Sequence, residues 1–504
     1  MKHILLSFSL LTIGAASYAQ NAMVKDISVG QDGSFPTRLT SFGKQLVFFA
    51  NDQGSTAFGN ELYAMDSAGA ITMAFNINPG TASSANIVNY LDMAVAGGKV
   101  YFPANDGTHG VELFSWDGVH QPTMVKDLYV GASSSNVSAV TAYQNKVYFN
   151  AATAATGNEV WVYDPGKNTM ELLADIVTGV GSSSPQNFAI YNNKLYFSAI
   201  EASTGRELYV YDAKADNVKM VADINTGAGF SDPQSLVVAN SRLYFSATDP
   251  AYGRELYCIF DTTLTRLTDV FAGANNSVTT AAVGQNRIGI LNGAVYFCAN
   301  DGTTGNELYM YDHKTDKTSF VYKINPLSGG APSSFTRFSN KLYFTANDGV
   351  HGNELWSYDG KGMPVMVVDI DTAAGMSSNP MNFVIHGDGM YFSAGEGEYG
   401  TELYVYRDPA VGIQKVSFDA EVKVYPNPTS SVANIELKLN KNESLGFRVM
   451  DMTGKKVYDA GIQLYSAGNN TIAVPMQSLT AGVYFYTITN ANGNMLVKGK
   501  IIKQ

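Results

Sequence analysis

The chain has 504 residues, of which 45% are hydrophobic and 15% are charged, and this composition excludes a disordered chain. The formal net charge of −11 argues against nucleic acid as a partner, because phosphate binding relies on a basic surface. The 48 Gly and the 12% of aromatic residues favour short strands joined by tight turns, so we expect an all-β protein.

The N-terminus "MKHILLSFSLLTIGAASYAQ" has the three parts of a signal peptide. Lys2 and His3 form a basic start, an apolar run follows, and small residues precede a cleavage site after Ala19. The apolar run is shorter than the roughly 18 to 20 residues that span a bilayer, and no later segment is long enough for a transmembrane segment. We therefore expect residues 1–19 to be removed on export.

One unit recurs eight times between residues 23 and 418, with a period of about 48 residues. In each copy a Phe is followed two residues later by an Ala, so both side chains share one face of a strand. After a turn come a Gly, a Glu two residues on, and an aromatic residue two further on. The Phe column is Phe48, Phe102, Phe149, Phe197, Phe245, Phe297, Phe344 and Phe392. The Gly column is Gly59, Gly110, Gly157, Gly205, Gly253, Gly305, Gly352 and Gly400. The Glu column is Glu61, Glu112, Glu159, Glu207, Glu255, Glu307, Glu354 and Glu402.

Each copy is expected to form four short strands, which we call A to D. In the fourth copy these are "NFAIYN", "KLYFSA", "RELYVYD" and "VKMVADI", with "NN" as a tight turn between A and B. Four strands in a period of 40 to 50 residues are typical of a β-propeller blade. The sequence thus predicts an all-β fold, with an eight-bladed β-propeller over residues 20–420 and a small Ig-like β-sandwich over residues 421–504.

The ends of the repeat region indicate how the ring closes. The segment "MVKDISVG" (23–30) matches the D-strand segments "MVKDLYVG" and "MVADINTG" further along the chain. It is therefore expected to pair with the last blade. The last copy carries a second candidate, "IQKVSF" (413–418), so the sequence leaves the outermost strand undecided.

The repeat resembles those of exported bacterial families with recurring "ELW…SDGT…GT" or "ELYVYD" units. The resemblance covers about residues 23–418 and implies a propeller fold. It implies no activity.

Candidate metal ligands lie in the loops between strands B and C. Three copies contain "NDG", and Asp and Glu oxygens around such a Gly turn are ligands that Ca²⁺ prefers. Asp is missing from other copies, however, and the spacing differs from that of an EF-hand. The alternative is that each column Glu is a structural lock, half buried between blades and bonded to backbone N–H groups of the adjacent turn. The candidate calcium ligands are Asp106, Glu112, Asp301, Glu307, Asp348 and Glu354; the accompanying structural residues are Gly110, Gly305, Gly352, Phe102, Phe297 and Phe344.

The sequence contains no known catalytic motif of a propeller enzyme: no Asp box of the sialidase type, no Gly-x-Ser-x-Gly and no His-Glu-x-x-His. His109 and His351 occupy equivalent loop positions in distant blades and are expected at the surface. Trp161 and Trp356 replace Tyr in the aromatic column, and Trp116 lies two residues beyond it, so we expect all three to pack in the core.

Cys258 and Cys298 fall in consecutive repeats of a chain that is expected to be exported, where a disulfide could persist. Two buried free thiols are an equally ordinary arrangement. The sequence leaves both possibilities open.

The last eighty residues leave the repeat at "VSFDAEVKVYPNPTSS" and alternate as the strands of a small β-sandwich do. The pieces "VYPNP" (424–428), "VMDMTGKKV" (449–457), "LTAGVYFYTI" (479–488) and "KGKIIKQ" (498–504) resemble the type A sorting domain of the type IX secretion system. This resemblance implies export through the type IX machinery, removal of the domain, and release or attachment to surface lipopolysaccharide. An ordinary Ig-like binding module is the alternative.

The long B–C and D–A loops place any binding surface on their common face of the propeller. The leading hypothesis is a secreted or cell-surface scaffold, such as an adhesin, that binds an extracellular glycan or protein without cofactor. The second is an extracellular polysaccharide hydrolase or lyase with acids from the insertions at 51–58 and 275–293. The third is a structural surface-layer component.

Overall fold

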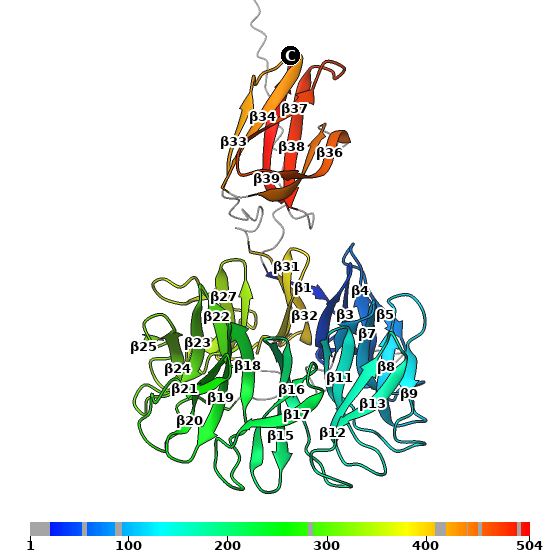
Figure 1. The fold of residues 1–504 in the computed structure, drawn as a ribbon, viewed down its shortest axis with the longest axis vertical. Coiled ribbons are helices and arrows are strands. Elements are labelled where there is room, and N and C mark those ends of the chain that lie inside the picture. The colour runs from blue at the N-terminus through cyan, green and yellow to red at the C-terminus, as the bar shows by residue number, and fades with distance from the viewer. Residues whose placement is uncertain are drawn as a thin grey trace, which may run out of the picture. The chain divides into compact units, whose positions relative to one another are not determined.

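The structure is a computed structural model whose chain divides into two compact units, Met1–Arg407 and Asp408–Gln504, which we describe separately (Figure 1). The predicted signal peptide at 1–19 and the candidate strand at 413–418 lie outside the described residues. In the part of the chain that is described, no helix is long and apolar enough to cross a membrane. The described residues are 21–52, 58–85, 93–280, 286–408, 420–440, 442–451, 456–490 and 495–504.

The first unit contains eight four-stranded antiparallel sheets, each with its strands in the order A-B-C-D. The A strands of neighbouring sheets contact one another from β6 to β30, and β30 of the last sheet lies beside β2 of the first. Blades 1 and 2 pack through the cluster that contains Phe49 and Phe102, so the sheets form a closed ring. The predicted eight-bladed β-propeller is thereby confirmed, and the contacts between A strands place these strands innermost.

The strands of blades 1 to 4 are β2 (Thr37–Phe42), β3 (Gln45–Asp52), β4 (Phe58–Met65) and β5 (Ile71–Phe75); β6 (Ala94–Ala96), β7 (Lys99–Asn105), β8 (Val111–Trp116) and β9 (Thr123–Lys126); β10 (Ser138–Tyr143), β11 (Lys146–Ala151), β12 (Glu159–Asp164) and β13 (Thr169–Ala174); β14 (Gln186–Tyr191), β15 (Lys194–Glu201), β16 (Gly205–Asp212) and β17 (Asn217–Ala222). Those of blades 5 to 8 are β18 (Gln234–Ala239), β19 (Arg242–Asp249), β20 (Gly253–Phe260) and β21 (Thr263–Arg266); β22 (Ile288–Leu291), β23 (Ala294–Ala299), β24 (Glu307–Asp312) and β25 (Lys317–Tyr322); β26 (Ser333–Phe338), β27 (Lys341–Asn347), β28 (Asn353–Tyr358) and β29 (Val365–Val368); β30 (Met381–His386), β31 (Gly389–Glu396), β32 (Gly400–Tyr406) and β1 (Asn21–Lys25).

The turn between strands A and B follows from local sequence. In blade 4 the two residues between β14 and β15 are Asn192 and Asn193, with φ of 46° and 55°. Two consecutive positive φ values define a type I′ turn, whose twist matches that of the flanking strands and which favours Asn. The predicted tight hairpin is therefore present.

The core lies between neighbouring blades, where the Phe and Ala columns pack. One cluster joins Leu291 and Tyr296 of blade 6 to Phe344, Ala346 and Trp356 of blade 7. Every Phe of the column is fully buried. The alternation of a large and a small side chain on one strand face lets adjacent sheets interdigitate, which is why this pair of residues repeats.

The ring is closed by the N-terminal strand. β1 pairs antiparallel with β32, with Asn21 opposite Tyr406 and Met23 opposite Tyr404. The predicted pairing of the N-terminal segment with the last blade is thus confirmed, and among the described residues β1 is the outermost strand of that blade, a point that the sequence had left undecided. Hydrogen bonding between the first and last parts of the repeat region joins the ring without a covalent link.

Both cysteines are free and buried. Burial raises the pKa of both thiols, and Cys298 has no exposed surface. We expect Ellman's reagent to label neither cysteine in the native protein and both in concentrated guanidinium chloride, because the thiolate is the reactive form and neither thiol is accessible. Rapid labelling of either thiol under native conditions would contradict this packing.

The second unit is a β-sandwich with one three-stranded and one four-stranded sheet, in the orders β33-β34-β37 and β36-β35-β38-β39. Alternate residues of each strand face the core, as with Ile435 and Leu437 of one sheet and Phe447 and Val449 of the other. The strands are β33 (Ala420–Tyr425), β34 (Val432–Leu439), β35 (Glu443–Met450), β36 (Lys456–Tyr465), β37 (Gly468–Pro475), β38 (Gly482–Asn490) and β39 (Met495–Lys503).

Candidate functional site

The column Glu residues tie each C strand to the D–A loop that leads into the next blade. Glu159 accepts hydrogen bonds from the backbone N–H groups of Ile176, Val177 and Ser183, and from the Ser183 hydroxyl at 2.5 Å. The equivalent loop residues donate hydrogen bonds to Glu207 and to most of the other Glu residues of the column. All eight Glu side chains are fully buried, deeper than the half-buried state expected from the sequence. The donors come from the D–A loop rather than from the nearby B–C turn.

Glu402 makes the same contacts across the closure of the ring. Its carboxylate accepts the N–H groups of Ile27, Ser28 and Ser34 and the Ser34 hydroxyl, all from the segment that follows β1. Burial raises the pKa of Glu402 to about 7, although the Ser34 and backbone donors oppose that shift. The Glu402 carboxylate thus reinforces the β1–β32 pairing that joins the two ends of the propeller.

The raised pKa makes stability dependent on pH. Because the folded protein holds the Glu402 proton more tightly than the unfolded chain, this contribution is complete below pH 4.5 and is lost as the pH rises through 7. We expect the free energy of unfolding to fall by about 2 kcal/mol between about pH 5 and about pH 7.5, from this residue alone. Urea denaturation at the two pH values measures the change. In the Glu402→Gln variant the difference in unfolding free energy between the two pH values should shrink by a similar amount. An unchanged difference would mean that Glu402 is not the source of this pH dependence.

The Asp residues of the "NDG" loops cap their own turns. Asp301 Oδ1 accepts the N–H groups of Thr303 and Thr304 at 2.8 and 2.7 Å, together with both threonine hydroxyls. Asp106 and Asp348 accept the equivalent N–H groups. Desolvation acts to raise the pKa of these three carboxyl groups, but their hydrogen bonds lower it overall, and at Asp106 and Asp348 these include a bond with the side chain of His109 or His351. The loop geometry is therefore explained within the turn itself.

The structure places the candidate calcium ligands in two different settings. The three Asp side chains bond within the B–C turns, while Glu112, Glu307 and Glu354 are enclosed and accept hydrogen bonds from the D–A loops. Within the described residues no group of three or more His, Cys, Asp or Glu side chains is arranged to hold a metal ion. Calcium at these positions stays a prediction.

The Gly column allows the B–C loop to approach the D–A loop. At Gly352, where φ is +79°, a Cβ atom would lie 1.9 Å from the Met376 carbonyl oxygen. Gly110 and Gly305 also have positive φ, and a Cβ atom there would lie 2.7 and 2.6 Å from the carbonyl oxygens of Ser133 and Ser328. The two kinds of loop therefore lie together on one face of the propeller, the face that the sequence had indicated. Phe102, Phe297 and Phe344 are fully buried beneath it.

The histidine and tryptophan side chains have structural surroundings. His109 and His351 bind Asp106 and Asp348 through Nδ1 at 2.8 and 2.7 Å, and they keep 35% and 40% of their side-chain surface exposed. Trp116, Trp161 and Trp356 are buried and belong to core clusters between blades, as expected.

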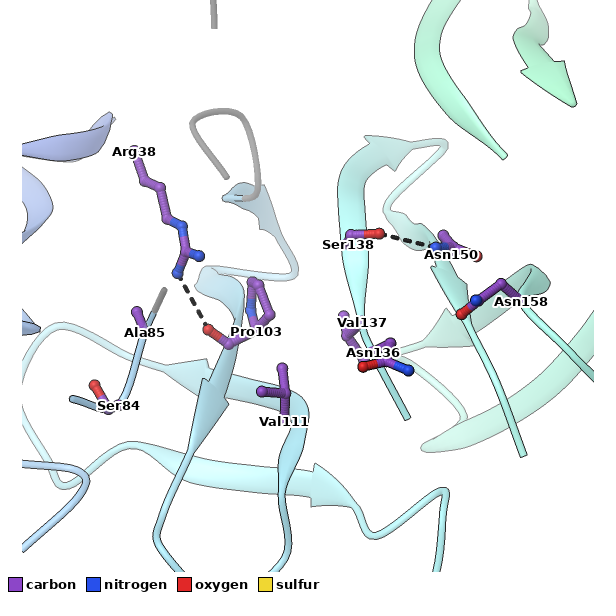
Figure 2. Close-up of a pocket in the computed structure, with 10 residues that line it drawn as sticks. All are labelled: Arg38, Ser84, Ala85, Pro103, Val111, Asn136, Val137, Ser138, Asn150 and Asn158. Carbon is purple, nitrogen blue, oxygen red and sulfur yellow. Dashed lines mark hydrogen bonds between the residues drawn. The ribbon is translucent and has the colours of Figure 1, made fainter. Parts of the chain in front are cut away.

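A pocket of about 270 Å³ opens where blades 1, 2 and 3 meet at this loop face (Figure 2). Figure 2 shows Arg38 extending toward Pro103 on one side, and Ser138, Asn150 and Asn158 grouped on the other. The described residues that line the pocket are Arg38, Ser84, Ala85, Pro103, Val111, Asn136, Val137, Ser138, Asn150 and Asn158.

The pocket arises from three repeat positions, which we call the inner trio of a blade. The first member of the trio is the residue that follows a Ser in the loop before strand A, such as Ser84, Ser135 or Ser231. The second member is the strand B residue that follows the column Phe. The third member is the residue that precedes the column Glu. In blade 5 it is Asp232, Ser246 and Arg254. Arg254 fills the space there, with Nη1 2.9 Å from the Asp232 carbonyl oxygen and 3.2 Å from Ser246 Oγ.

The trios of blades 2 and 3 lack such a filling side chain. In blade 2 the trio is Ala85, Pro103 and Val111, and in blade 3 it is Asn136, Asn150 and Asn158. All six of these residues line the pocket. The cavity thus exists because shorter side chains replace the arginine found in blades 4 and 5.

Several polar groups of the pocket are held in place by contacts within the fold, and two amide oxygens have no partner among the described residues. Asn150 is 8% exposed and donates from Nδ2 to Ser138 Oγ at 2.9 Å. Its Oδ1 and that of Asn158 are enclosed and accept no hydrogen bond from the described residues. Arg38 is 4% exposed, donates to the Pro103 carbonyl oxygen at 3.3 Å and lies 5.0 Å from the centre of the Phe49 ring. Buried polar atoms without a partner cost stability, and a ligand hydroxyl that donates to these oxygens offsets that cost.

Sequence reasoning had directed attention to the repeated Asp and Glu residues and missed this pocket. The signal was present in the trio columns, where blade 3 has three Asn and blade 2 has three apolar residues. Of the two insertions proposed to supply catalytic acids, 51–58 and 275–293, residues 53–57 and 281–285 lie outside the described part of the chain.

The comparisons with known proteins define the C-terminal unit. Residues 423–504 match the family of the secretion system C-terminal sorting domain. This match confirms the type IX sorting domain that the sequence motifs indicated. The chain is therefore an exported, secreted or cell-surface β-propeller protein, and its sorting domain is the element that addresses the type IX machinery. Comparison with curated proteins gives no match.

The chain is distantly similar to several solved structures. PorZ, an essential bacterial surface component of the type IX secretion system of Porphyromonas gingivalis, is 12% identical with a TM-score of 0.39; the match covers 92% of this chain, which spans 64% of PorZ. The β-propeller domain of the Trilobed protease from Pyrococcus furiosus is 9% identical with a TM-score of 0.39, over 67% of this chain and 96% of that domain. A puromycin-hydrolysing peptidase of Mycobacterium tuberculosis is 11% identical with a TM-score of 0.46, over 82% and 60% of the two chains. These likenesses carry no argument about activity.

Proposed function

We propose that the chain is a secreted or cell-surface scaffold that binds an extracellular glycan or protein, as an adhesin does, after export by the type IX system. The observation that carries this proposal is the pocket at the loop face, built from residues that depart from the repeat and that hold enclosed oxygen atoms without partners. Loops on a rigid scaffold are where binding residues concentrate. We also propose that the repeats are of the ELY/ELW type found in exported bacterial proteins.

A screen of glycans and polysaccharides against the purified full chain tests the proposal. Binding and released products are read together, with and without EDTA. We expect binding without products, because the repeated acids are occupied by hydrogen bonds within the fold. Released oligosaccharides would overturn the binding-scaffold proposal in favour of a hydrolase or lyase. Loss of binding with EDTA would support calcium in the "NDG" loops.

A further inference from the structure

The two walls of the pocket differ in chemistry. The blade 2 wall, formed by Ala85, Pro103 and Val111, is apolar. The blade 3 wall, formed by Asn136, Asn150 and Asn158, carries three side-chain amides. A sugar ring has the same division, with C–H groups on its faces and hydroxyls around its edge. An amide can donate to one hydroxyl and accept from its neighbour, which suits vicinal hydroxyls.

Among the described residues that line the pocket the charge has one sign. Arg38 is the only charged residue of these ten, and none of the ten is acidic. Its guanidinium is enclosed by the Phe49 ring and the Pro103 carbonyl group, so its position is held before any ligand arrives. An arginine held in this way favours a carboxylate, to which it makes strong charge-assisted hydrogen bonds. This positive site stands in a chain whose net charge is −11.

From these observations we propose that the pocket between blades 1, 2 and 3 binds one acidic monosaccharide unit, a sugar ring bearing a single carboxylate. The assignment rests on the proposed glycan-binding function and specifies its site and ligand class. The ring packs on the apolar blade 2 wall, its hydroxyls bond to the Asn150 and Asn158 amides, and its carboxylate faces Arg38. The volume of about 270 Å³ lies just below the roughly 300 to 1,000 Å³ of ordinary ligand pockets, which suits one ring rather than a longer segment.

The test is a calorimetric titration of the full chain with matched pairs of sugars. One pair is an oligomer of galacturonic acid and its methyl ester; the other is a sialylated oligosaccharide and its methyl ester, so the two sources of an acidic sugar are separated. We expect at least one free acid to bind and its ester to bind at least ten-fold more weakly, because esterification removes the charge that Arg38 recognises. Equal affinity for acid and ester would overturn the proposal.

Two substitutions locate the binding. Asn158→Ala removes an amide from the wall, and Arg38→Met removes the charge while keeping a long side chain against Phe49. Each should weaken binding of the free acid about ten-fold or more. Asn306→Ala, at the same column position in blade 6, and Arg337→Met, in the A strand of blade 7, are the matched controls and should bind as the wild type does. Thermal unfolding midpoints identify any variant that fails to fold. If Arg38→Met fails to fold, the affinity of Asn158→Ala alone tests the proposal.

The outcomes separate the pocket from the wider function. If the protein binds a glycan in the screen but the Asn158 and Arg38 variants retain full affinity, the pocket assignment is wrong and the proposed function stands. If the wild type binds neither acidic sugar, the ligand class is wrong. If the screen finds no glycan or protein ligand at all, the proposed function fails with it.

Discussion

Replacing Glu402 with alanine should lower the free energy of unfolding of the propeller by about 3 kcal/mol or more, because the change leaves several buried donors without an acceptor. The N–H groups of Ile27, Ser28 and Ser34 all point at this carboxylate. These donors lie in the N-terminal segment, while Glu402 lies in the last blade. The substitution therefore weakens the junction that closes the ring. Urea denaturation followed by tryptophan fluorescence measures the loss.

Glu398→Ala is the matched control for this experiment. Glu398 is an exposed carboxylate in the B–C turn of the same blade, so its removal should change stability by no more than about 0.5 kcal/mol. If Glu402→Ala lowered the free energy of unfolding no more than Glu398→Ala does, Glu402 would not stabilise the closed ring. The pairing of β1 with β32 would then be the contact that closes it.

A substitution in the Phe column should have a still larger effect. Phe344 is fully buried, with its ring centre 5.4 Å from that of Phe335, and it packs in the cluster that joins blades 6 and 7. Phe344→Ala removes a fully buried ring from that interface and leaves a cavity. We expect a loss of about 4 kcal/mol, measured by the same denaturation experiment.

The comparison for Phe344 is Phe320→Ala in blade 6. Phe320 lies on the outer strand β25 and is 45% exposed, so its loss should cost about 1 kcal/mol or less. Similar losses at the two positions would mean that the blade interfaces do not carry the stability of the ring.

The fold could be predicted in detail because its determinants recur. A Phe and an Ala two residues apart, repeated eight times, indicate a strand that packs on a neighbour, and the "NN" of blade 4 specifies the turn that the structure shows. The pairing of the N-terminal strand with the last blade was predictable from a match between segments. Its competitor at 413–418 could not be excluded, since either sequence can form an edge strand.

The candidate site was less accessible to sequence reasoning. The lock role of Glu402 could be anticipated, but its donors could not, since they come from a segment distant in sequence. The pocket was missed because it depends on three positions per blade that converge only in the folded ring. Val111 and Asn158 share a column with Arg254, and only the structure shows that the arginine fills the space that the shorter residues leave open.

The central claim is that function lies in residues that depart from the repeat rather than in the repeated acids. The most direct test is the affinity of the full chain for an acidic glycan in the Asn158→Ala and Asp301→Asn variants, measured side by side. We predict a loss of about ten-fold or more in Asn158→Ala and no change in Asp301→Asn, whose side chain serves its own turn. Loss of binding in Asp301→Asn with full affinity in Asn158→Ala would contradict the claim and indicate that the "NDG" loops bind the ligand.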